Sequence, residues 1–102
     1  MVTHVVFFKF ADPADAEQAR TLLLGMQGRI PGLRQVEAGL DFTRSARSFD
    51  LALITRHDDR SALDVYRDHP VHQEVARFIR ERSTASAAVD FVGSVTEQGA
   101  AV

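Results

Sequence analysis

Apolar residues follow two different spacings along this chain, a two-residue period typical of strands and a longer period typical of helices. The segment His4–Phe10 is rich in Val and Phe and has apolar side chains on both parities. A strand that is apolar on both sides is covered on both sides. We therefore predict a first strand with His4, Val6, Phe8 and Phe10 on one face and Val5 and Phe7 on the other.

A helix is predicted immediately after this strand. Asp12 can cap its start, and Pro13 suits its first turn. Apolar residues then recur at helical spacing, which predicts an amphipathic helix of about four turns. Gly28 and the pair Pro31-Gly32 are expected to end it. The apolar positions are Ala16, Ala19, Leu22, Leu23, Met26 and Ile30.

The middle of the chain returns to the two-residue period. Leu33–Thr43 is predicted to be a second strand, and Phe49 to about Arg56 a third. The segment Ser45–Ser48 between them is predicted to be a turn. We expect these two strands to pair as an antiparallel hairpin.

The last third of the chain predicts two helices and a strand. Asp59 or Ser61 can cap a short helix, and Pro70 interrupts it and begins the next. The segment from Val89 to Val95 alternates as a fourth strand. We assign one domain to residues 1–95 and expect a flexible C-terminal tail at 96–102.

The element order β-α-β-β-α-α-β is typical of an α+β, ferredoxin-like fold with a four-stranded antiparallel sheet. In this fold the helices cover one sheet face and leave the other open. An apolar open face exceeds the few hundred Å² that soluble monomers expose. We expect a homodimer that packs open face against open face, and a monomer with a moderately apolar face is the alternative. The residues expected there are Val6, Phe8, Phe10, Val36, Ala38, Leu40 and Phe42, or most of them.

The amino-acid composition argues against several classes of site and partner. The 102 residues include no cysteine, so disulfides, zinc–thiolate sites and thiol nucleophiles are excluded. The formal charge of −2 argues against a nucleic-acid partner. The apolar run Val5–Phe8 is far shorter than the ~20 residues of a membrane span. With no secretory signal pattern, we expect a cytoplasmic protein with no membrane contact.

The string Tyr66–His72 resembles the Tyr-x-x-His-Pro-x-His signature of the stress-responsive A/B barrel (Dabb) family. Three other segments match that family in the same order: His4–Phe10, the Ile30–Leu33 elbow followed by Gly39, and Phe49–Leu53. The resemblance covers about residues 2 to 94. It implies a dimeric α/β barrel formed by two packed sheets, and it implies no single activity.

Some members of that family resemble a plant polyketide cyclase that works without a cofactor. The resemblance implies that Tyr66 and His72 are an acid/base pair and that His4 lines the pocket. An imidazole with a pKa of ~6.5 can accept a proton near neutral pH, and a phenol can donate to a developing oxyanion. Leu51 stands where the cyclase has a further pocket histidine. His57, at the far end of the strand, is not expected to replace it.

We hypothesise a protein of unassigned activity that binds a small hydrophobic molecule in a pocket between sheet and helices. The alternative is a cofactor-independent, cyclase-like lyase. A dimeric stress protein without catalysis also stays open, as does a subunit of a larger assembly. Val6 and Phe8 are assigned to the pocket or the core.

Each candidate side chain also has a structural interpretation. His69 can end one helix before Pro70 begins the next, with its ring bonded to a freed carbonyl. Tyr66 can be a core residue whose hydroxyl reaches the surface. His4 and His72 can be half-buried packing residues. Because Pro70 separates His69 from His72 and no third ligand is placed, we predict no metal site. The resemblance to a cyclase that works without a cofactor implies that this chain needs none either.

Overall fold

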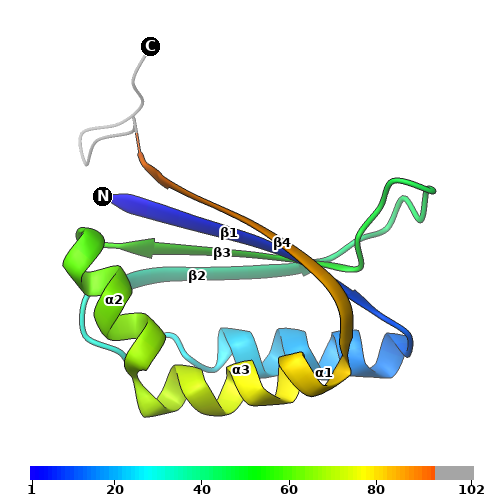
Figure 1. Ribbon diagram of the computed structural model, residues 1–102, viewed down its shortest axis with the longest axis horizontal. Helices are drawn as coiled ribbons and strands as arrows, with labels where there is room; N and C mark the ends of the chain where they lie inside the picture. The colour runs from blue at the N-terminus through cyan, green and yellow to red at the C-terminus, as the bar shows by residue number, and fades with distance from the viewer. Residues whose placement is uncertain (94–102) are drawn as a thin grey trace.

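The computed structural model describes residues 1–93, so the expected tail at 96–102 lies outside the described residues. The predicted ferredoxin-like order is confirmed (Figure 1). The elements are β1 (Val2–Phe10), α1 (Pro13–Leu24), β2 (Leu33–Leu40), β3 (Leu51–His57), α2 (Arg60–Asp68), α3 (Pro70–Arg82) and β4 (Ser83–Val92).

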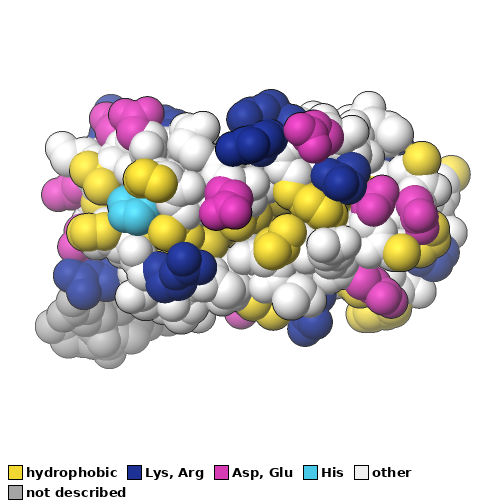
Figure 2. All heavy atoms as spheres, turned by 90° about the horizontal axis from the view of Figure 1, so that it is seen from below, with side chains coloured by type: hydrophobic (Ala, Val, Ile, Leu, Met, Phe, Trp, Pro, Cys, Tyr) yellow, Lys and Arg dark blue, Asp and Glu magenta, His cyan; other side chains and the backbone are white. Residues whose placement is uncertain are grey.

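The four strands form one antiparallel sheet in the order β2-β3-β1-β4. The three helices all lie on one side of it, with α1 and α3 side by side, and the opposite sheet face carries no helix (Figure 1). The outer surface of the helical layer mixes acidic, basic and small apolar side chains (Figure 2). The molecule therefore has one polar, helical side and one bare sheet side.

Two helix starts follow the capping chemistry of their sequences. Asp12 accepts a hydrogen bond from the backbone N–H of Ala14 at 2.9 Å, and Pro13 occupies the first turn of α1. Asp59, one of the two predicted caps, accepts from the N–H of Ala62 at 2.8 Å at the start of α2. Each cap gives a free backbone donor of the first turn a partner.

Several element bounds differ from the predicted ones, and three of the differences concern α1, β2 and β4. α1 ends at Leu24, and turns continue from there, although Met26 and Ile30 remain buried. β2 stops at Leu40, three residues earlier than expected. β4 begins earlier than expected, at Ser83, because its first half also pairs with β1. That half is rich in Ser and Ala, which are weak strand formers, so the sequence pattern does not indicate a strand there.

The prediction for the open sheet face was wrong in its choice of side chains. Val6, Phe10 and Ala38 belong to the buried core under the helices. Phe8 and Val36 are partly buried and pack against the same core. The error has a physical source: both parities of β1 are apolar, so the pattern alone does not say which face the helices cover.

Strand register defines the side chains of the open face. Val5 pairs with Ile54 on one neighbouring strand and with Val89 on the other, and residues paired in this way share a face. Leu40 pairs with the buried Leu51 and so belongs to the covered side, although it is 39% exposed at the end of β2, and Phe42 is 92% exposed in the loop beyond it. The open face is thus apolar, as expected, but its residues come mainly from β1, β3 and β4.

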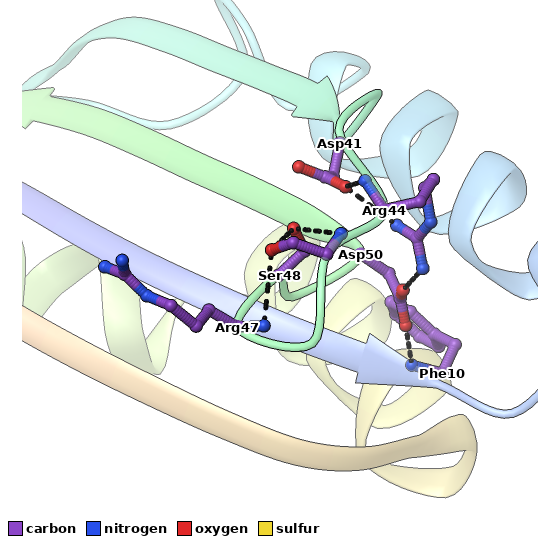
Figure 3. A network of polar contacts seen from close by, with 7 residues as sticks. Phe10, Asp41, Arg44, Arg47, Ser48 and Asp50 are labelled. Atoms are coloured by element: carbon purple, nitrogen blue, oxygen red, sulfur yellow. Dashed lines mark hydrogen bonds and ion pairs between the residues drawn. The ribbon is translucent and has the colours of Figure 1, made fainter.

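The loop between β2 and β3 is held to the end of β1 by Asp50 (Figure 3). The carboxylate of Asp50 accepts from the backbone N–H of Phe10 at 2.7 Å and pairs with the guanidinium of Arg44. Asp41 accepts from the backbone N–H of Arg44, whose φ is 52°. The bond from Phe10 and then the bond from Arg44 lower the pKa of Asp50, so this carboxylate stays ionised and keeps the loop in place.

Gly32 and Gly28 allow a matched test of the chain reversal between α1 and β2. Both have a φ of +79°, which L side chains rarely adopt. A Cβ at Gly32 would lie 2.7 Å from the Cβ of Ala62 on α2, whereas a Cβ at Gly28 would meet nothing within 4 Å.

We expect Gly28→Ala to lower the free energy of unfolding by about 1 kcal/mol, the cost of the backbone conformation alone. Gly32→Ala should cost about 2–3 kcal/mol, because the contact with α2 adds to that strain. Urea unfolding followed by circular dichroism measures both values. Equal losses in the two variants would show that Gly32 does not pack against α2.

Candidate functional site

The junction between α2 and α3 positions the residues of the predicted signature. His69 has an extended backbone, with ψ of 136°, and it caps both the end of α2 and the start of α3. Its Nδ1 accepts a hydrogen bond from the backbone N–H of Val71 at 3.1 Å. The ring therefore bonds a backbone donor of α3 rather than the freed carbonyl that the sequence suggested.

The side chain of His72 forms the hydrogen bond to the freed carbonyl instead. Its Nδ1 lies 3.0 Å from the backbone oxygen of Arg67. Because a carbonyl oxygen can only accept, the Nδ1 carries the proton, and the Nε2 of the neutral ring is left as an acceptor. Burial lowers the pKa of His72, which outweighs the effect of the Arg67 bond. His72 is therefore a neutral imidazole with a free basic nitrogen near neutral pH.

Tyr66 lies at the centre of three histidine rings. Its ring centroid is 4.2 Å from that of His72, 4.8 Å from that of His57 and 6.0 Å from that of His4. Tyr66 is almost fully buried, and its hydroxyl has no hydrogen-bond partner within residues 1–93. Burial raises the pKa of Tyr66, so the phenol keeps its proton. An unpaired buried hydroxyl costs about 1–3 kcal/mol, which a polar group on a ligand would offset.

His57 is the residue of this cluster that sequence reasoning missed. It is fully buried at the end of β3, and its Nε2 lies 2.8 Å from the hydroxyl of Thr55. Its Nδ1 has no partner among the described residues. Burial lowers the pKa of His57 to about 4, with smaller contributions from the charges of His4 and Arg67. The Nδ1 of His57 is therefore, after the hydroxyl of Tyr66, a second buried polar atom without a hydrogen-bond partner in the described residues.

His4 is held by an ion-pair network that joins β1, β4 and α2. Its Nδ1 bonds a carboxylate oxygen of Asp90, and the other oxygen of Asp90 accepts from Arg67 at 2.6 Å. Desolvation alone would raise the pKa of Asp90, but the bond from His4 and the charges of His4 and Arg67 lower it overall. The ionised Asp90 therefore fixes the orientation of the His4 ring that faces Tyr66.

A cavity of about 250 Å³ lies between the sheet and α3. Tyr66, His72 and His4 line it, and so do Val6 and Phe8. Most of its remaining wall is apolar, from Leu23, Leu53, Val75, Ala76 and Ile79. His57 is not part of the wall and lies behind Tyr66. The cavity thus joins an apolar interior to a polar end made by one phenol and two imidazoles.

Within residues 1–93, no three His, Cys, Asp or Glu side chains converge in a group that could hold a metal ion. In the same residues, no helix is long and apolar enough to cross a membrane.

The sequence pattern of the stress responsive A/B barrel domain (Dabb) matches residues 2–93. The chain belongs to this family. The match spans every element of the Dabb fold described above, from β1 to β4. The resemblance inferred from the signature string is therefore confirmed.

Two relatives agree with this assignment of the Dabb chain. It is 30% identical over 89 residues to an uncharacterised protein of Streptomyces coelicolor, covering 82% of this chain and 92% of that protein. It is also similar to a dimeric ferredoxin-like protein of unknown function from Thermobifida fusca. That match has 28% identity, a TM-score of 0.79 and 88% coverage of both chains.

The same fold also occurs in an enzyme. The hydroxynitrile lyase of Passiflora edulis has a TM-score of 0.77 to this chain at 16% identity, with 94% of each chain covered. At this identity the likeness shows the fold alone. The Dabb fold therefore occurs both in proteins of unknown function and in an enzyme.

The depressed pKa of His57 predicts how the stability of this chain depends on pH. The folded-state pKa of about 4 lies below the ordinary 6.5, so the unfolded chain binds a proton first as the pH falls. The stabilisation is fully present above pH 6.5 and is lost progressively down to about pH 4. The loss from His57 should reach about 3 kcal/mol.

The variant His57→Phe keeps an aromatic ring and removes the titration. We expect its free energy of unfolding to fall much less than that of the wild type over this range. His72, whose pKa is shifted in the same direction, is present in both proteins and cancels in the comparison. Urea unfolding at half-unit steps of pH measures the two slopes. Identical slopes would mean that folding does not lower the pKa of His57.

Proposed function

We propose that this Dabb chain is a homodimer that binds a small, mainly apolar molecule in the cavity beside Tyr66 and His72. The cavity carries the proposal: a concave, mainly apolar space with a few convergent polar groups is the usual form of a small-molecule site. Its size of about 250 Å³ is below the ~300–1,000 Å³ of drug-sized sites, which favours a small ligand. The unpaired hydroxyl of Tyr66 supplies a hydrogen-bond donor for it.

The open sheet face supports the homodimer. Phe7 is 43% exposed, Phe91 47% and Val89 61%, all on the side of the sheet without helices. Fully burying each such side chain contributes about 1.5–3 kcal/mol. Summed over several residues on each of two copies, this contribution can exceed the cost of association. Solved relatives with the same fold are described as dimeric. A two-fold pairing of these faces gives the α/β barrel.

A charge on the open face tests the dimer. We expect Val89→Asp to convert the protein to a monomer at micromolar concentration, because each copy would bury an unpaired carboxylate in the interface. Sedimentation equilibrium measures the mass. Val65→Asp is the matched control, since Val65 is also exposed (47%) but lies on α2. A dimer that survives Val89→Asp, or that Val65→Asp disrupts instead, contradicts the proposed interface.

Acid/base catalysis is the second candidate function, as in a cyclase-like lyase. The geometry of His72 favours it, because the Arg67 carbonyl fixes the proton on Nδ1 and leaves Nε2 as a base. In such a step Nε2 removes a proton from the carbon beside a ligand carbonyl. The electron pair moves to the carbonyl oxygen, which accepts a hydrogen bond from the Tyr66 hydroxyl. No oxidant or second reactant is needed for this enolisation.

One experiment separates binding from catalysis. A medium-chain methyl ketone such as nonanone is titrated against the protein, and exchange of its α-protons for deuterium is followed by NMR. Ala76→Phe, which fills a wall of the cavity, should weaken binding about tenfold. His72→Gln should leave binding within about twofold but slow exchange at least about a hundredfold.

Ala14→Phe is the control for the bulky substitution, because Ala14 is exposed on α1 and away from the cavity. If Ala76→Phe binds the ketone as tightly as the wild type, the cavity is not the binding site. If the wild type binds but does not accelerate exchange over buffer, the acid/base candidate is lost and the binding function stands.

A further inference from the structure

The cavity is elongated, with different chemistry at its two ends. Along β1 its wall runs from His4 to Phe8, about 13 Å of extended strand. Along α3 it runs from His72 to Arg80, about 12 Å of helix. One end of the cavity therefore lies at Tyr66, and the second end lies where α3 passes into β4. The β1 wall and the α3 wall give about the same length between these two ends.

Arg80 is the charged side chain of that second end. It is exposed, it lines the cavity, and its guanidinium has no partner within residues 1–93. Arg82, two residues later, is paired with Asp15 and Glu81. The positive charge of Arg80 also reaches the other end of α3, since it is one of the charges that lower the pKa of His72. An unneutralised cation thus borders an apolar space.

Two hydroxyl side chains accompany this cation. Ser83, which ends α3, and Ser86 on β4 both line the same cavity. A guanidinium offers paired N–H donors in a planar fork that matches a carboxylate, and hydroxyls can donate to the same oxygens. A single arginine balances the single charge of a carboxylate better than the double charge of a phosphate.

We infer that the ligand of this cavity is an amphipathic carboxylate, with its apolar chain between β1 and α3 and its carboxylate at Arg80, Ser83 and Ser86. The inference rests on the proposed binding function and names the class of molecule that the cavity takes. It also orients the ligand, because the end remote from the carboxylate lies against Tyr66 and His72.

Decanoate and decanol are the probes, since they share a chain and differ in the charged group. Tyr66 is the only tyrosine and the chain has no tryptophan, so the intrinsic fluorescence of the protein reports on the cavity alone. Titrations at pH 8, repeated by calorimetry, give the dissociation constants. We expect the wild type to bind decanoate about fivefold more tightly than decanol.

Arg80→Gln should remove that preference and leave decanol binding unchanged. Arg77→Gln is the matched control, because Arg77 is an exposed arginine on the same helix that does not line the cavity. Equal binding of the two probes by the wild type, or a preference that Arg80→Gln retains, overturns the inference while the binding function stands. A preference lost equally in Arg77→Gln also overturns it. If neither probe binds, both the inference and the proposed function fail.

Discussion

Pro70 imposes the constraint on which the candidate site depends. A proline disfavours helical backbone at the preceding residue, and His69 is extended there. The break leaves the carbonyl of Arg67 without its helical partner, and the side chains of His72 and Gln73 bond it instead. The same break turns α3 so that its first turn brings His72 against the Tyr66 ring. Without it, one continuous helix would carry these two rings at a fixed six-residue offset.

Much of the fold could be predicted from sequence because its signals are local. A run rich in Val and Phe marked β1, alternation marked β3, and Pro70 marked the helix break. The covered face of β1 was assigned wrongly to the open side, since Val5 and Phe7 are as apolar as Val6 and Phe8. Only the packing of the helices on Val6 and Phe10 resolves that choice.

The candidate site could be predicted only in part. The signature string named Tyr66 and His72, and both line one cavity with His4. His57 was set aside, although its parity with Leu51 and Leu53 places it on the covered face, and that was the available signal. Its contact with Tyr66 depends on how α2 returns over the sheet, which no local pattern encodes.

The position of β1 has a consequence for how the chain is made. β1 lies between β3 and β4, so the first strand to be synthesised forms hydrogen bonds with the last. Until β4 exists, a nascent chain can pair β1 with β3 on one edge only. The other edge stays open along Val2–Phe10 and can template pairing with a neighbouring chain. The strand order itself thus leaves one edge of β1 without a partner until the last strand of the domain is made.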